Sequence, residues 1–156
     1  MKTRKDKEDA LMKKTVLTVF LFLLPLAALI LEVLPYGAVL VFGTQGAGGE
    51  IETIRTLTSY FDPLLIGYAN FGPPPAFFLT CALLLCGIAL LFKTEACLAL
   101  SVIAVFAFTA SILPLIYGIS YLSVLGIAVS LLLGAEAVLA HIMWRAHVKA
   151  AAKTEN

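Results

Sequence analysis

The chain has few charged residues for its length. Charged residues make up 13% of its 156 residues, whereas a soluble globular domain carries about 25%. Hydrophobic residues reach 61%, and the mean hydropathy is +0.99. This composition excludes an ordinary soluble domain, and the length leaves room for a single membrane domain.

Residues that supply catalysis or bind metals are also scarce. The three cysteines form no C-x-x-C pair, and none lies in the polar part of the chain, so we expect no structural disulfide. His141 and His147 are six residues apart and fall on different faces of a helix, which is poor for a shared metal. No G-x-S-x-G or H-E-x-x-H motif is present. We therefore expect no enzyme, no metal and no cofactor.

The basic residues are concentrated in three places. Six lie in residues 2–14, three lie in residues 145–153, and Lys93 stands alone between them; only Arg55 lies elsewhere. Lys and Arg near the ends of membrane spans stay on the cytoplasmic side. Both termini are therefore predicted to be cytoplasmic. Because the positions of the basic residues are explained by membrane topology, we expect no nucleic-acid partner.

Four apolar runs alternate with these basic segments. Each approaches the roughly 20 residues that a helix needs to cross about 30 Å of hydrocarbon. The predicted spans are residues 15–34, 76–92, 97–117 and 121–144. The predicted fold is an all-α membrane protein: a four-helix bundle (15–144) in the cell membrane, with cytoplasmic tails at 1–14 and 145–156 and an extracellular loop at 35–75. Short connections make the second and third, and the third and fourth, spans antiparallel neighbours.

The long loop contains two β-prone segments around a Gly-rich turn. The segment 38–42 is short and apolar, the segment 43–49 is rich in Gly, and the segment 51–61 is rich in Thr, Ile, Tyr and Phe. This order predicts a β-hairpin resting on the outer end of the bundle. Ile51, Ile54 and Leu57 also have helical spacing, so a helix over 51–61 is the alternative.

Glu136 is the ionisable residue predicted deepest in a span. It precedes Arg145 by nine residues, which places it roughly 13 Å inside the cytoplasmic boundary at 1.5 Å per residue. A charge there costs about 2.5 kcal/mol or more. We expect a neutral carboxyl, hydrogen-bonded to a carbonyl that Pro25 leaves free. Its role is either a tie between helices, which we favour, or a proton or cation relay. Glu32 lies near the outer end of the first span, where we expect water to reach it.

Small residues recur at four-residue spacing on the last span. Such patterns allow close helix approach, which drives association in lipid. A weaker series of small residues on the third span could receive them. The predicted packing residues are Gly126, Ser130 and Gly134 on the fourth span, and Ala104, Ala107 and Ser111 on the third.

The loop is also rich in aromatic residues. They form either a docking surface or, as we favour, a cap on the bundle at the level of the lipid headgroups. The candidate surface residues are Tyr60, Phe61, Tyr68 and Phe71.

Three motifs in this region, LPYGAV (34–39), SYFD (59–62) and GYANFGP (67–73), resemble those of small uncharacterised four-span bacterial membrane proteins. That resemblance implies the fold but no activity. The layout is also similar to that of claudins, although the Trp and paired Cys of the claudin loop are missing.

Two functions fit these features. The first is a non-catalytic scaffold or accessory subunit that lies in the bilayer and binds a membrane protein partner or further copies of itself. The alternative is a small oligomeric transporter or channel that uses Glu136 as a proton or cation site. Four spans are few for a solute pathway, so the second function would need several copies.

Overall fold

The computed structural model describes residues 4–45, 49–63, 65, 70–92 and 96–152. These residues are mostly helical and contain one small two-stranded sheet. Within these ranges, four helical segments are long and apolar enough to cross a membrane. They are α1 (Arg4–Val33), α3 (Pro73–Phe92), α4 (Cys97–Ile112) with its 3-10 continuation η2 (Leu113–Tyr117), and α5 (Val124–Ala152).

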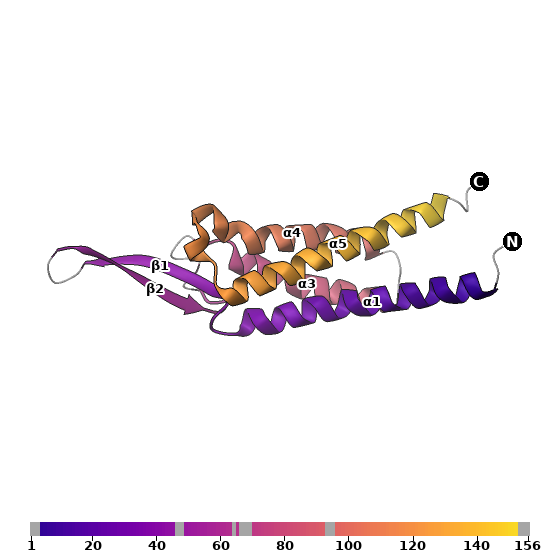
Figure 1. Cartoon of the computed structure of the whole chain (residues 1–156), viewed down its shortest axis with the longest axis horizontal. Helices are drawn as coiled ribbons and strands as arrows, with labels where there is room; N and C mark the ends of the chain where they lie inside the picture. Colours follow the sequence, from indigo (N-terminus) through magenta and orange to yellow (C-terminus); the bar gives the residue numbers. More distant parts are fainter. Residues whose placement is uncertain (1–3, 46–48, 64, 66–69, 93–95, 153–156) are drawn as a thin grey trace.

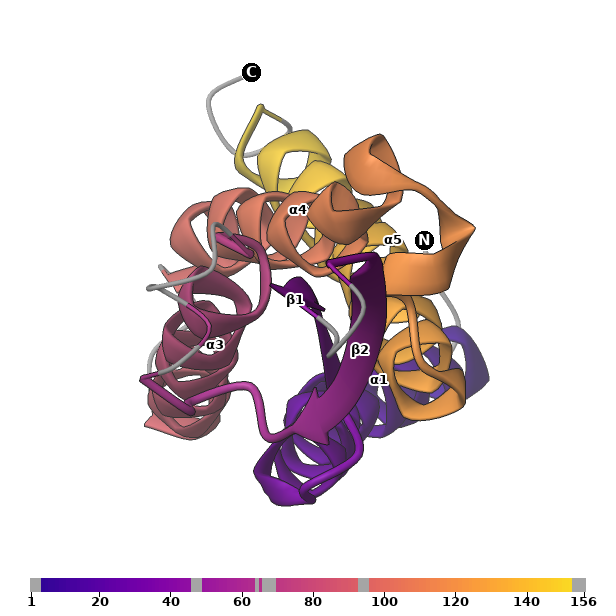
Figure 2. The same cartoon turned by 90° about the vertical axis from the view of Figure 1, so that its left-hand side faces the viewer.

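The four helices form a ring of antiparallel neighbours. Helix α1 packs against α3 and α5, and α4 packs against the same two helices, as the view along the bundle shows (Figure 2). The start of α1 and the end of α5 lie at one end of the molecule, and the sheet lies at the other (Figure 1). Each helix contributes a fully buried leucine to the interior: Leu21, Leu83, Leu100 and Leu133.

The helix ends differ from the predicted spans for identifiable reasons. Helix α1 begins at Arg4, because residues 4–14 contain no Gly or Pro and are mostly good helix formers. The α-helical part of the third segment ends at Ile112, since Pro114 lacks the N–H that an α-helix needs and the chain continues as a 3-10 helix. Helix α5 starts only after Ser123, whose Oγ accepts the Gly126 N–H at 2.8 Å as an N-terminal cap.

The predicted hairpin is confirmed, and the helical alternative for its second segment is wrong. Strands β1 (Ala38–Gln45) and β2 (Ile51–Thr58) pair antiparallel, with Ala38 opposite Thr58 and Gln45 opposite Ile51. The hairpin reaches past the helix ends along the long axis of the molecule (Figure 1). The start of β1 is buried, whereas residues 51–57 of β2 are all exposed.

Candidate functional site

Glu136 lies on the inner face of α5 and is completely buried. Neither of its carboxyl oxygens has a hydrogen-bond partner among the described residues. The expected hydrogen bond to a carbonyl freed by Pro25 is therefore not formed within this part of the chain. A buried polar group without a partner is costly, on the order of 1–3 kcal/mol.

A second buried carboxyl lies at the hairpin end of the bundle. Glu32, in the last turn of α1, is also fully buried, so the expectation that water reaches it is wrong. The chain that follows β2 folds back over the end of α1, where the Tyr60 N–H donates to the Glu32 backbone carbonyl at 3.0 Å. This contact comes from a residue distant in sequence. The position of Glu32 near the end of the span could therefore not reveal it.

The Glu32 side chain is tied to α3 through Thr80. Thr80 Oγ1 lies 2.9 Å from Glu32 Oε1 and 2.9 Å from the backbone oxygen of Ala76. A hydroxyl carries one hydrogen and accepts others. Both contacts are satisfied when Thr80 donates to Ala76 and a neutral Glu32 carboxyl donates to Thr80. The second oxygen, Oε2, has no partner within the described ranges.

Tyr60 belongs to the interior, not to an outer surface. It is 1% exposed, and its ring lies so close to Gly37 that a Cβ added there would meet Cδ1 at 3.0 Å. Burial raises the pKa of the Tyr60 phenol. Tyr60 therefore does not belong to a docking surface.

The other loop aromatics have different positions. Phe61 and Phe71 are about half exposed, at 49% and 51%. The Phe61 ring contacts that of Phe77 on α3, with the ring centroids 5.4 Å apart. Tyr68 lies outside the described residues, as does Lys93.

The small residues of α5 lie where neighbouring groups come close. A Cβ on Gly126 would meet the Gly37 carbonyl at 3.0 Å, and one on Gly134 would meet the Phe108 ring at 3.1 Å. Ser130 Oγ lies 2.9 Å from the Gly126 carbonyl oxygen and 3.3 Å from that of Ser111 on α4. The small residues of α4 that were expected to face α5 are all buried: Ala104, Ala107 and Ser111.

Polar side chains fix the base of the hairpin to the helices. The Asn70 side-chain amide donates to the Val39 carbonyl at 2.8 Å, and Ser123 Oγ donates to the Gly37 carbonyl at 2.6 Å. From β2, Arg55 donates to a backbone carbonyl in the connection before α5, that of Leu122, at 3.2 Å. These roles were not predicted from the sequence, although Arg55 stands out there as the one basic residue outside the three basic segments.

No metal-binding cluster is found in the described part of the chain, since no three His, Cys, Asp or Glu residues come together there. Cys81, Cys86 and Cys97 form no disulfide among the described residues; Cys97 is buried, and Cys81 and Cys86 are half-buried.

No protein-family model, curated protein or solved structure matches the chain. Two features of the fold bear on its function: the pair of buried carboxyls and the projecting hairpin.

Proposed function

We propose that the chain is a non-catalytic, four-span integral membrane protein that acts as a scaffold or accessory subunit and binds a membrane protein partner through its hairpin. In this arrangement the hairpin is extracellular and both termini are cytoplasmic. The charge distribution supports the orientation. The described basic residues at the terminal end of the bundle include Lys13, Lys14, Arg145 and Lys149, whereas Arg55 is the one described at the hairpin end.

The observation that carries the docking role is the exposure of β2. A two-stranded hairpin alone is at best marginally stable in water, yet every residue from 51 to 57 is exposed, and Ile51 is 81% exposed. In the described chain β2 pairs only with β1, so its outer edge is free to accept another strand. Apolar side chains on both faces, Ile54 on one and Leu57 on the other, would gain burial from a partner.

The base of the hairpin is held rigidly, which suits a docking element. Val39 and Leu40 at the start of β1 are buried, and Ala38 forms an isolated antiparallel β-bridge with Leu122, just before α5. The hydrogen bond from Arg55 to the same segment fixes the second strand. A pre-ordered element loses less entropy on binding, so more of the contact energy appears as affinity.

Site-specific photo-crosslinking in native membranes tests this function. A photoreactive amino acid at Ile51 or Ile54 should give a discrete adduct with one partner protein, or with a second copy of the chain. The matched control is Ile119, which is 72% exposed in a different segment of the same end. Adducts from all three positions alike, or from none, would refute a specific hairpin interface.

The two buried carboxyls favour a second candidate, a proton or cation pathway in an oligomer. Glu136 and Glu32 are both fully buried and both carry an oxygen without a partner in the described structure. Gly126, which approaches the Gly37 carbonyl just beyond the end of α1, precedes Glu136 by ten residues, or about 15 Å along α5. The two carboxyls therefore lie at different levels of the bundle. Direct proton transfer needs about 3 Å, so water or an ion would have to connect them.

Flux assays in liposomes test this candidate. Glu136→Gln and Glu32→Gln should each abolish proton or cation flux, while Glu52→Gln, on the exposed strand β2, should leave it unchanged. Absence of flux in the unmodified protein for protons, sodium and potassium would eliminate the pathway and leave the scaffold role.

A further inference from the structure

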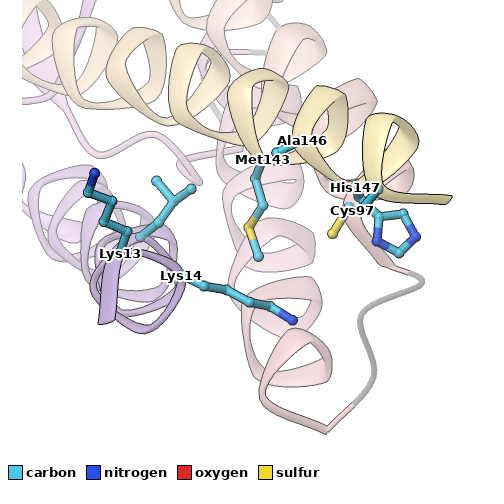
Figure 3. Close-up of a pocket in the computed structure, with 8 residues that line it drawn as sticks. Lys13, Lys14, Cys97, Met143, Ala146 and His147 are labelled. Atoms are coloured by element: carbon cyan, nitrogen blue, oxygen red, sulfur yellow. The ribbon is translucent and has the colours of Figure 1, made fainter. Parts of the chain in front are cut away.

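A cavity opens between α1, α4 and α5 at the end of the bundle opposite the hairpin. Its volume is about 500 Å³, within the roughly 300–1,000 Å³ typical of sites for small molecules. Most of its lining is apolar, and basic side chains stand at its edge (Figure 3). The lining residues are Lys13, Lys14, Leu17, Cys97, Met143, Ala146, His147 and Ala150.

The basic side chains come from two different helices. Lys14, on α1, reaches beneath Met143 toward the side of the cavity where His147 of α5 lies, whereas Lys13 turns away from Met143 (Figure 3). No acidic residue stands three or four positions from Lys14 or from His147 in the sequence. Neither side chain therefore has a helical ion-pair partner of the usual spacing, which leaves the edge of the cavity attractive to an anion.

The cavity also lies at the level where the apolar part of the helices begins. The apolar window of α1 begins at Met12, so Lys13 and Lys14 stand at its boundary, while Leu17 and Met143 lie further inside. A ligand that matches this order has a negative group at the boundary and a hydrocarbon chain beyond it. Basic pockets between transmembrane helices on the cytoplasmic side bind anionic lipid headgroups in this way.

We propose that this cavity binds an anionic phospholipid of the cytoplasmic leaflet. Its phosphate lies between Lys14 and His147, with Lys13 at the outer edge. One acyl chain lies against Leu17 and Met143. A zwitterionic lipid is a poorer ligand, because its own cation would stand next to Lys14. The site rests on the membrane placement proposed above, but it does not depend on the hairpin partner or on flux.

Lipid titration of the purified full-length protein in detergent, followed by native mass spectrometry, tests the headgroup contact. Dioleoylphosphatidylglycerol should bind with a lower Kd than dioleoylphosphatidylcholine. Lys14→Gln should weaken binding of the anionic lipid about fivefold. The control Lys149→Gln removes a charge from an exposed residue that borders a different hollow of α5, and should leave that Kd unchanged. Equal binding of the two lipids, or equal loss in both variants, would overturn the site.

A second pair of variants tests the hydrocarbon contact. Ala146→Phe places a ring in the cavity and should abolish saturable binding of the anionic lipid while every charge is retained. Val148→Phe, on the face of α5 that borders the other hollow, should bind as the unmodified protein does. Normal binding by Ala146→Phe would overturn the acyl-chain contact.

Carbonate extraction of membranes separates failure of the lipid site from failure of the membrane placement. The proposed placement requires the chain to stay in the membrane pellet. A chain released into the supernatant would refute that placement, whatever the lipid titration in detergent gives.

Discussion

Replacing Glu136 by Met tests whether the buried carboxyl contributes to stability or is kept despite a cost. Both Glu136 oxygens are buried, and neither has a partner among the described residues. An unsatisfied buried polar group costs about 1–3 kcal/mol. Met keeps an unbranched chain of similar length and adapts well to irregular spaces. Glu136→Met should therefore be more stable to unfolding by about 1–3 kcal/mol.

This difference in the free energy of unfolding is measured by adding sodium dodecyl sulfate to the protein in micelles of a mild detergent. The fluorescence of the single tryptophan reports the unfolding. Trp144 is a suitable probe because it lies on the same helix and its ring contacts that of His141, with the centroids 5.3 Å apart. The control Glu136→Gln retains two polar atoms and should stay within about 1 kcal/mol of the unmodified protein. A loss of stability in Glu136→Met would refute the reasoning, because it would mean that the carboxyl has a stabilising partner.

The same titration checks two further predictions. Thr80→Val leaves both carboxyl oxygens of Glu32 without a partner and should cost about 1–3 kcal/mol, whereas Thr80→Ser should not; equal stability of the two variants would refute this hydrogen bond. Gly72→Ala places a Cβ 2.7 Å from the Ala110 backbone oxygen, so overpacking should cost about 1–3 kcal/mol; unchanged stability would mean that the residue before α3 moves easily away from α4.

The helices and the hairpin were predictable because their signals are local. Apolar runs of about 20 residues identified four helical segments, and β-prone segments around a Gly-rich turn identified the hairpin. The change of helix type near the end of the third segment was not predicted, although Pro114 is a local signal for it. The start of α1 was missed because residues 4–14 were treated as a tail on grounds of charge, although their helix propensity is high.

The surroundings of the candidate sites could not be predicted in the same way. The Glu32 carbonyl accepts the Tyr60 N–H and the Glu32 carboxyl is paired with Thr80, and both contacts depend on how the chain returns from the hairpin to α3. The cavity beside Lys14 needs Met143 and His147 from the opposite end of the sequence. One sequence contains no signal for such long-range contacts, since hydropathy reports only how apolar each segment is.

Labelling of single cysteines with a membrane-impermeant maleimide in intact cells tests the membrane arrangement most directly. In a background with the three native cysteines replaced by serine, Thr53→Cys lies on the exposed strand β2 and Lys149→Cys lies near the end of α5. We predict that Thr53→Cys is labelled in intact cells and that Lys149→Cys is labelled only after the membrane is permeabilised. Labelling of both positions under the same condition would contradict a four-span bundle with its hairpin outside and its termini inside.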